Sequence, residues 1–258
     1  MAELHNPTLR VTSVLSTLYK NETGMTLTEL SNATKIPKGT LHPIVLTLLS
    51  TQFLKMNGNK FQIGKSAFQV GNAYFYEFDH MELVKKVMNQ ITHECDEICQ
   101  LGVLDGGEVL YMAKVETSSA IRLTSSVGHT LKAYATAIGR ALLAYKSDEE
   151  IYALYPAGIT PYTSKTTSTM EDLLKKVDLV RKTGFSHEAG EVNPDIGCLA
   201  IAMKNATLSS TSFAAISVSV PLFRLNKKKF EFIKDLLLRK KSYIEQEIAR
   251  GSLSSFKS

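Results

Sequence analysis

The sequence predicts a protein of two domains, a winged helix-turn-helix at the amino end followed by an α+β domain with a mostly antiparallel sheet. Within residues 1–63, three stretches with helical spacing of apolar residues precede two short alternating stretches around Asn57-Gly58-Asn59. Further along the chain, alternating stretches are joined by tight turns and interspersed with helical patterns. At 258 residues, with 44% hydrophobic and 21% charged side chains, the chain is long enough to bury two cores.

Composition narrows the class of protein further. The three cysteines, Cys95, Cys99 and Cys198, are too few and odd in number for a disulfide framework, which fits a reducing compartment. No apolar stretch approaches the roughly 20 residues of a membrane span, and residues 1–10 lack the apolar block of a signal peptide. We therefore expect a cytoplasmic protein with no membrane partner.

The formal net charge of +5 is unevenly distributed. Residues 1–63 carry +3 and residues 224–258 carry +6, which leaves −4 for the part between them. Basic ends around an acidic middle favour a polyanionic partner, although only weakly.

The amino end shows the order of elements of a helix-turn-helix. The first helix follows Pro7, a residue suited to a helix start. Thr26 and Glu29 form a capping box that opens a short second helix over about 27–34, and Lys35-Ile36-Pro37 breaks it. A third helix after this break begins with small and polar residues and continues as an apolar-periodic stretch. Two short helices around a tight turn are typical of this motif.

A hairpin follows the third helix. The Asn-Gly pair predicts a turn in which both central positions take a positive φ. A hairpin placed directly after a recognition helix forms a wing. The start of the third helix would lie in the major groove, with Lys38, Thr40 and His42 near the bases and Gly39 allowing close approach of the backbone. The expected DNA contacts are Lys35, Lys38, Gly39, Thr40, His42, Lys55, Asn57, Asn59 and Lys60. The alternative is that these elements only pack a small core.

Pro43 stands inside the predicted third helix and removes one backbone donor. Near a helix start this cost is lower, because the first N–H groups have no partner within the helix. We expect the proline either to shift the helix start or to alter how the first residues enter the groove.

The rest of the chain alternates between helical and strand patterns. Residues 64–80 predict a connecting helix with an aromatic face, which favours packing against protein. A helix over about 81–97 places Leu83, Val87, Ile91 and Cys95 on one side. Strands are expected over 99–104, 108–113, 120–124, 185–188, 198–202 and 213–220, the first two joined at Asp105-Gly106-Gly107. Further helices are expected over 136–145, after Ser147, from a capping box at Ser168-Thr169 to Gly184, and after Asn226.

Four segments in this order resemble the IclR family of transcriptional regulators, over about residues 8–250. They are Thr28-Glu29-Leu30 through Leu48-Leu49 with the wing, Ala135-Thr136-Ala137-Ile138-Gly139-Arg140-Ala141-Leu142-Leu143-Ala144, Gly184-Phe185 through Glu191 with Cys198-Leu199-Ala200, and Phe213 through Pro221. The resemblance implies a sequence-specific repressor whose C-terminal domain is GAF-like and binds a small-molecule effector, assembled as a homodimer or homotetramer on a double-stranded DNA operator. The expected boundaries are 1–63 for the DNA-binding domain, 64–80 for the connecting helix and 81–258 for the effector-binding domain.

This chain departs from the family pattern at four places. Pro43 stands where the family usually has Arg, and Tyr134 stands where it has His. Asp195 replaces a preferred glycine, and Met203-Lys204 replaces an apolar pair that contains proline. The first departure bears on the operator sequence, and the other three bear on the effector.

The resemblance also implies which residues bind the effector. They are Ile121, Leu123, Ala137, Ile138, Glu188, Cys198, Ser217 and Ser219. Backbone donors at the helix start after Thr136 suit a carboxylate, so we expect a small organic acid. Ser217 and Ser219 share one strand face, which either lines this site or faces solvent. Glu188 would repel an anion, so it either binds a hydroxyl or lies outside the site, and Cys198 is equally well read as an ordinary buried thiol.

Other classes of function have less support. His93, Cys95 and Cys99 fall on one expected helix with only the two thiols facing together, and no zinc-ligand spacing occurs, so we expect no metal and no cofactor. No nucleophile elbow or phosphate loop occurs, and His187-Glu188 would point to opposite faces of a strand, so we expect no enzyme. The remaining alternatives are a small-molecule-binding enzyme and a winged-helix adaptor that binds protein instead of DNA.

Overall fold

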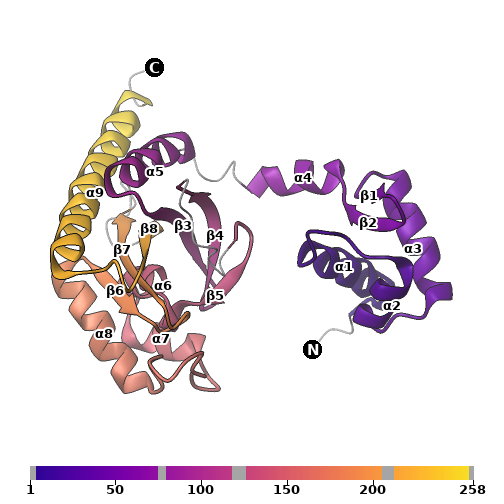
Figure 1. Ribbon diagram of the computed structural model, residues 1–258, viewed down its shortest axis with the longest axis horizontal. Coiled ribbons are helices and arrows are strands. Elements are labelled where there is room, and N and C mark those ends of the chain that lie inside the picture. Colours follow the sequence, from indigo (N-terminus) through magenta and orange to yellow (C-terminus); the bar gives the residue numbers. More distant parts are fainter. Residues whose placement is uncertain (1–3, 75–79, 118–125, 205–211, 256–258) are drawn as a thin grey trace. The chain divides into compact units, whose positions relative to one another are not determined.

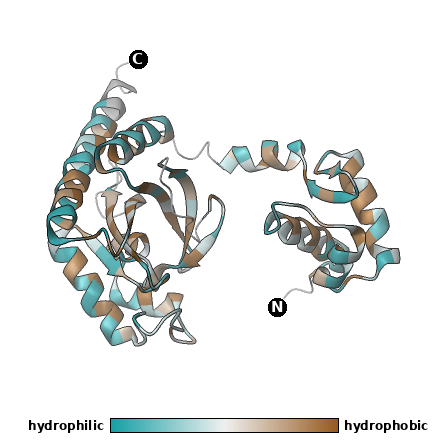
Figure 2. Ribbon diagram, viewed as in Figure 1, coloured by the Kyte–Doolittle hydropathy of each residue, from teal (hydrophilic) through white to brown (hydrophobic). Residues whose placement is uncertain are grey.

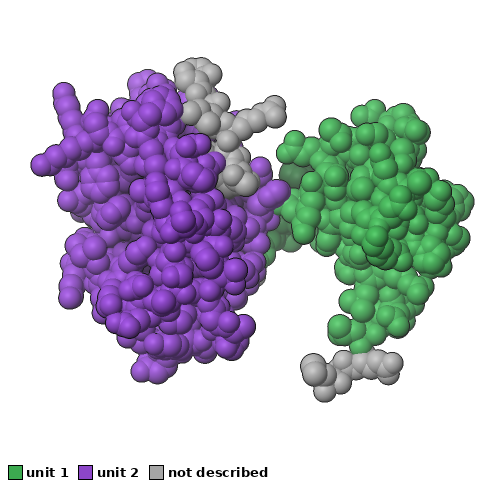
Figure 3. Space-filling model, turned by 60° about the horizontal axis from the view of Figure 1, so that its bottom comes forward, with its two compact units in different colours: residues 1–79 green, residues 80–258 purple. Residues whose placement is uncertain are grey.

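The computed structural model describes residues 4–74, 80–117, 126–204 and 212–255. The chain divides into two compact units, residues 1–79 and 80–258 (Figure 3). Each unit has a buried apolar cluster of its own. No helix in the described part is long and apolar enough to cross a membrane.

The first unit is a winged helix-turn-helix (Figure 1). Its elements in order are α1 (Asn6–Tyr19), α2 (Leu27–Thr34), α3 (Lys38–Ser50), β1 (Leu54–Asn57), β2 (Lys60–Ile63) and α4 (Lys65–Asn72). The three helices bury one apolar face each around Val14, Leu30 and Val45, and the hairpin adds Leu54 and Phe61 to the same cluster. The helix order and the wing that the sequence predicts are thereby confirmed.

Local chemistry fixes the turn between α2 and α3. The predicted capping box is present: the Thr26 Oγ1 accepts from the Glu29 amide at 3.3 Å, and the Glu29 carboxylate accepts from the Thr26 amide at 2.8 Å. At the other end of α2, Lys35 takes a left-handed φ of 59°. Pro37 then caps α3 with extended backbone. These features place α3 directly after a short, rigid turn.

The wing turn differs from its prediction. Asn57 pairs with Lys60, so the two loop residues are Gly58 and Asn59 instead of Asn57 and Gly58. Among these two, only Gly58 has a positive φ, at 59°. A single positive φ at the first loop position is the pattern of a type II′ turn, which needs glycine only there. The predicted hairpin is correct, but its turn type was wrong.

The second unit is built on one six-stranded antiparallel sheet in the order β5-β4-β3-β8-β7-β6. The strands are β3 (Ile98–Asp105), β4 (Glu108–Val115), β5 (Thr130–Lys132), β6 (Ser186–Ala189), β7 (Ile196–Lys204) and β8 (Ser212–Pro221). The predicted hairpin between β3 and β4 is confirmed, with Gly106 and Gly107 at φ of 51° and 87°. The strand expected over 120–124 lies outside the described residues.

Helices cover both faces of this sheet (Figure 1). On one face lie α6 (Ala137–Leu143), α7 (Asp148–Leu154) and α8 (Met170–Thr183), with a short 3₁₀ turn η2 (Ala133–Ala135) leading into α6. On the other lie α5 (Met81–Cys95) and α9 (Lys227–Ser255). Hydrophobic residues gather on the inner sides of these helices (Figure 2). The arrangement agrees with the expected GAF-like α+β domain.

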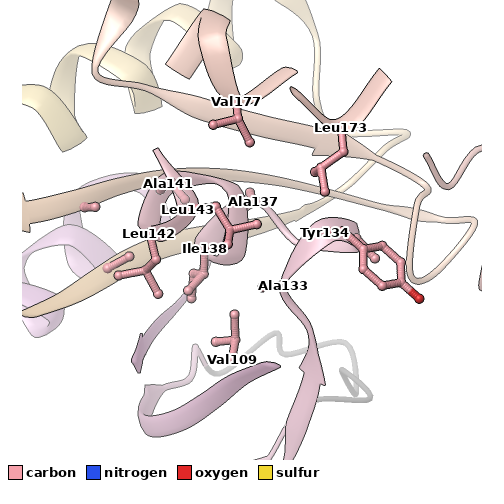
Figure 4. Close-up of a cluster of buried hydrophobic side chains, with 14 of the residues drawn as sticks. Val109, Ala133, Tyr134, Ala137, Ile138, Ala141, Leu142, Leu143, Leu173 and Val177 are labelled. Carbon is pink, nitrogen blue, oxygen red and sulfur yellow. The ribbon is translucent and has the colours of Figure 1, made fainter. Parts of the chain in front are cut away.

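The core between the sheet and α6 sets the position of the later site. Ile138, Ala141 and Leu142 of α6 pack with Val109 of β4 and with Leu173 and Val177 of α8 (Figure 4). Gly139 lets α6 lie against η2, because a Cβ at this position would come within 2.1 Å of the Ala133 carbonyl oxygen. The N-terminus of α6 is therefore held at a fixed place over the sheet.

Several expected boundaries need correction. The expected helix over 64–80 forms α4 only as far as Asn72, and residues 75–79 lie outside the described part. α5 ends at Cys95 because Asp96 takes a left-handed φ of 54°. The buried side of α5 includes Val84 in place of the expected Leu83. The N-cap of α8 is Thr169, whose hydroxyl accepts from the Asp172 amide, so the predicted capping box at Ser168 was wrong, whereas the stop at Gly184 is confirmed.

Candidate functional site

α3 carries four of the nine residues expected to contact DNA, and three of these, Lys38, Gly39 and His42, are exposed on its outer face. Leu41, Val45 and Leu48 are buried, so the opposite face is open to solvent. The exposed residues of α3 are Lys38, Gly39, His42, Pro43, Leu46, Thr47 and Ser50. Thr40 is half-buried and lies at the border of this face. A Cβ at Gly39 would meet no atom within 4 Å, so packing inside the unit does not require a glycine there.

Pro43 does not shift the start of α3, which the preceding turn determines. The amides of Thr40 and Leu41 both donate to the Pro37 carbonyl at 2.9 Å, so the helix begins at Lys38, five residues before the proline. Pro43 has no N–H to donate to the Gly39 carbonyl, but this carbonyl belongs to an exposed residue and can be hydrated. The helix continues to Ser50, and the expected shift of its start was wrong. With Leu46, 50% exposed, Pro43 makes part of the outer face apolar.

The wing adds a second basic surface to the first unit. Lys55 pairs with Gln62 and Asn57 pairs with Lys60, so Lys55, Asn57 and Lys60 lie on one face of the hairpin. Lys35, Lys38, Lys55 and Lys60 form no ion pair among the described residues. Four lysines on α3, the turn before it and the wing are the charge pattern that a phosphate backbone attracts.

A small cavity lies in the second unit, between the sheet and the start of α6. It encloses about 40 Å³. The residues that line it are Gln100, Tyr111, Leu131, Thr136, Ala137, Ile138, Glu188, Val192, Asn193, Ile196, Cys198, Ser217 and Ser219. The structure thus brings together all the expected effector residues that it describes, whereas Ile121 and Leu123 lie outside the described part.

The floor of this cavity is a chain of polar groups on three neighbouring strands. Ser217 and Ser219 are 2% and 3% exposed, so the alternative that they face solvent was wrong. Ser219 donates to the Gln100 Oε1 at 3.3 Å, and the Cys198 sulfur lies 3.3 Å from the Ser219 hydroxyl. Gln100 was not among the residues expected here, although its alternation with Cys99 and Leu101 on a predicted strand could have placed it on this face.

Glu188 is the one charged side chain among the described residues that line this cavity. It is 5% exposed, and its Oε2 accepts from the Glu191 amide at 2.8 Å. Burial raises the pKa of Glu188 above its ordinary value, because a carboxylate loses hydration there. The charged form of Glu188 is therefore less favoured here than in water.

A buried ion cluster holds the loop over 190–195, which lines the cavity through Val192 and Asn193. Arg140 is 1% exposed, and its Nη1 lies 2.8 Å from the Glu191 Oε1. Lys176 Nζ lies 3.0 Å from the same oxygen. Burial by itself would raise the pKa of Glu191, but Arg140 and Lys176 outweigh it, and this pKa lies below its ordinary value. The ion cluster therefore fixes one wall of the cavity.

Some sequence-predicted features lie away from both sites. Tyr134 is buried, and its hydroxyl donates to the Thr160 carbonyl at 2.6 Å, outside the cavity lining. Cys95 ends α5 while Cys99 lies in β3, so the expectation that both share a helix was wrong. Among the described residues no three His, Cys, Asp or Glu side chains form a metal-binding group. His187 is exposed and Glu188 is buried, as expected for neighbours on a strand.

Comparison with known proteins identifies both units. Residues 8–58 match the IclR helix-turn-helix domain, and residues 73–244 match the family described as bacterial transcriptional regulator IclR C-terminal. The HTH-type transcriptional regulator XynR of Escherichia coli (strain K12) is 26% identical over 220 residues, which cover 84% of this chain and 86% of XynR. The transcriptional repressor IclR of the same organism is 26% identical over 217 residues, covering 82% of this chain and 78% of that protein.

The fold is shared with solved structures as well. An IclR homologue from Microbacterium hydrocarbonoxydans, crystallised with 4-hydroxybenzoate, superposes with a TM-score of 0.81 at 19% identity, covering 94% of this chain and 99% of that chain. At this identity the likeness shows the fold alone. The family matches span both units and most of the sequence, and this chain belongs to the IclR family of transcriptional regulators, with an N-terminal DNA-binding helix-turn-helix and a C-terminal effector-binding domain.

Proposed function

We propose that this regulator is a repressor. It dissociates from an operator, or binds it differently, when a small organic acid occupies the cavity over the sheet. The observation that carries this proposal is the set of four lysines on α3, the turn before it and the wing, which form no ion pair among the described residues. In our assignment residues 1–63 bind DNA, residues 64–80 connect, and residues 81–258 bind the effector. Because it would act on the chromosome, we place this protein in the cytoplasm of a bacterial cell. Regulation of this kind requires no catalysis.

The DNA contacts that we propose comprise bases and phosphates. Lys38, Thr40 and His42 would lie at the base edges of the major groove, with the backbone of Gly39 close to a phosphate. Lys35, Lys55 and Lys60 would bind phosphates, and Asn57 and Asn59 would reach the groove from the wing. Support comes from the exposure of seven of these nine residues, whereas Thr40 and Lys60 are half-buried.

DNA binding is tested by fluorescence anisotropy with DNA from upstream of the chain's own gene. We expect affinity that falls steeply with salt, because phosphate contacts release counterions. Lys38→Ala should weaken binding, whereas Lys175→Ala, on the exposed side of α8, should leave it unchanged. Binding that ignores salt and Lys38 would favour the protein-binding adaptor instead.

The effector that we propose is a small carboxylic acid. A cavity of about 40 Å³ has room for about three water molecules, and it opens to solvent, so it suits a small ligand. Ser217, Ser219 and Gln100 offer hydrogen bonds, and a neutral Glu188 would donate to a carboxylate. The homologue crystallised with 4-hydroxybenzoate supports an acid, although that ligand is larger.

Isothermal titration calorimetry with a panel of acids tests this assignment. We expect heat of binding from acids of two to four carbons or from 4-hydroxybenzoate, and a loss of that heat in Ser219→Ala, which removes the hydroxyl between Gln100 and Cys198. The Lys38→Ala variant serves as the control, because its cavity is intact. An acid that binds Ser219→Ala as tightly as the unaltered chain would place the effector elsewhere.

We also propose that the chain works as a homodimer or homotetramer. α4 has no buried residue within its own unit, and Phe68 and Val70 are 72% and 64% exposed. Exposed apolar side chains of this kind favour burial against a second copy. Two copies would read half-sites about 10 bp, or a multiple, apart. Analytical ultracentrifugation of the unaltered chain and of Phe68→Glu tests this, with a smaller species expected for the variant.

A further inference from the structure

A second cavity lies on the same face of the sheet, at its edge between β6 and α8. It encloses about 260 Å³, several times the volume of the effector cavity. Its lining includes Arg140, Lys165, Lys176 and Ser186. Ser186 pairs with Ala200 and Glu188 with Cys198, so β6 presents both side chains to the side of the sheet that carries α6. Glu188 lines both cavities, which makes them neighbours with different chemistry.

Positive charge exceeds negative charge in this second cavity. Arg140 and Lys176 share the single carboxylate of Glu191, at 2.8 and 3.0 Å. Lys165 adds a third cation that forms no ion pair among the described residues. Its ammonium group lies above Gly190, where an added Cβ would come within 3.1 Å of the Nζ, so it sits beside the residue that precedes Glu191. The cluster therefore carries at least one uncompensated positive charge.

The adjacent histidine responds to this field. Burial lowers the pKa of His187, and Arg140 and Lys176 lower it further, against the opposite effect of Glu191. Burial is the largest cause of this lower pKa, and the two cations add to it.

Two polar atoms at this cavity are buried without a partner among the described residues. They are the Ser186 hydroxyl oxygen and the Arg140 Nε, and both residues are only 1% exposed. A buried polar group without a hydrogen bond costs about 1–3 kcal/mol. Both residues line the cavity, so a ligand with several acceptor oxygens would satisfy donors that the chain leaves unsatisfied.

We propose that this second cavity binds a small oxyanion, held by Lys165 and Lys176 at its mouth and by Ser186 and Arg140 at its floor. The chemistry that recognises it is that of a phosphate, sulfate or carboxylate group, because all four side chains are donors and three are cations. The effector cavity has no described Lys, Arg or His in its lining, so a multiply charged anion is bound here and not there. The site does not depend on the identity of the effector.

The test uses the full chain and inorganic phosphate. Thermal unfolding is followed by circular dichroism in millimolar sodium phosphate and in sodium chloride of equal ionic strength. We expect the midpoint temperature to rise with phosphate and to saturate, because the anion binds only the folded state. Sulfate, acetate and glycerol 3-phosphate show whether charge, the carboxylate group or a phosphate monoester is preferred.

Single substitutions locate the binding. Lys165 is exposed, so Lys165→Gln should fold normally and bind phosphate about tenfold more weakly, as expected for the loss of one charge-assisted hydrogen bond. Ser186→Ala should weaken binding independently. Lys175→Gln, whose lysine pairs with Glu171 and Asp172, and Lys38→Gln on α3 should leave the phosphate effect unchanged. The proposal is overturned if phosphate stabilises no more than chloride, if Lys165→Gln and Ser186→Ala respond like the unaltered chain, or if Lys38→Gln abolishes the effect.

Discussion

Glu188 and Glu191 show how position decides the behaviour of a side chain. Both are 5% exposed, and they are three residues apart. The Glu191 carboxylate forms ion pairs with Arg140 and Lys176. It also accepts hydrogen bonds from the amide and hydroxyl of Thr167, so its charged form is favoured. The Glu188 carboxylate accepts mainly from one amide, that of Glu191. Loss of hydration therefore dominates and raises its pKa, which disfavours the charged form. One carboxylate therefore anchors a loop, while the charged form of the other is disfavoured by burial beside a cavity.

Replacing Glu191 should destabilise the fold. Glu191→Gln removes the charge that Arg140 and Lys176 share and leaves the Arg140 guanidinium buried, so we expect the free energy of unfolding at neutral pH to fall by about 3 kcal/mol. The folded-state pKa of Glu191 lies below its ordinary value of 4.5, so its contribution is present above that pH and is lost as pH falls through the folded-state pKa. Urea unfolding at several pH values should show the difference between the two chains shrinking in acid. A difference that does not change with pH would contradict this account.

Glu188→Gln should have the opposite pH dependence. The folded-state pKa of Glu188 lies above its ordinary value of 4.5, so folding favours the protonated group, and this contribution is lost as pH rises through the folded-state pKa. The glutamine carbonyl can still accept from the Glu191 amide. We therefore expect the variant to gain stability relative to the unaltered chain as pH rises above about 4.5, in the same urea experiment. A constant difference would show that Glu188 is not penalised when charged.

Two glycines in helices, Gly139 and Gly39, differ in whether packing requires them. Gly139 in α6 meets the backbone of η2, whereas Gly39 in α3 has open space around it. The first glycine is required because helix and turn touch, and this contact fixes the start of α6 beside the effector cavity. The second meets no atom inside its own unit, so packing there does not require it, and we propose that its role lies in DNA binding.

Substituting these glycines should separate folding from DNA binding. Gly139→Ala forces a backbone shift, and we expect it to cost about 1–3 kcal/mol of stability, as overpacking of a core does. Gly39→Ala should leave stability unchanged or raise it by up to about 1 kcal/mol, because alanine favours the helix, while weakening DNA binding through a blocked approach to phosphate. Chemical denaturation measures the first effect and anisotropy the second. Unchanged DNA affinity in Gly39→Ala would remove Gly39 from the interface.

At the scale of the whole chain, the two units have separate apolar clusters. Leu41 belongs to the cluster of the first unit, and Leu199 is buried against the other face of the second unit's sheet. The DNA-binding unit and the effector-binding unit can therefore differ in stability although they belong to one chain.

A core substitution in one unit should leave the function of the other in place. Leu41→Ala removes a fully buried side chain and should cost about 2–5 kcal/mol, with loss of DNA binding. We expect the phosphate-dependent midpoint shift of the second unit, and heat from any acid that binds the unaltered chain, to persist. The matched substitution Leu199→Ala should abolish these signals first. Circular dichroism and calorimetry on both variants decide the question, and loss of all signals in Leu41→Ala would mean that the units unfold together.

Much of the DNA-binding unit was predictable because its determinants are local. The capping box at Thr26 and the apolar spacing of α3 act within a few residues, and they define the elements and their buried faces. The turn at Gly58 was assigned to the wrong pair, because strand register decides which residues occupy the loop. The break after Cys95 was missed because a left-handed Asp96 leaves no clear mark in the sequence.

The sequence by itself determined the family, the order of the elements and the candidate residues on α3, since periodicity, caps and motifs are written in neighbouring positions. Only the tertiary structure decided that Gln100 joins Ser219 in a cavity, and that Arg140 and Lys176 converge on one carboxylate. It alone brought Lys165 over Gly190 to form a second, basic cavity. The physical reason is that charges and hydrogen bonds act through distance in space, and strand order, which sets those distances, depends on pairings between residues far apart in the chain.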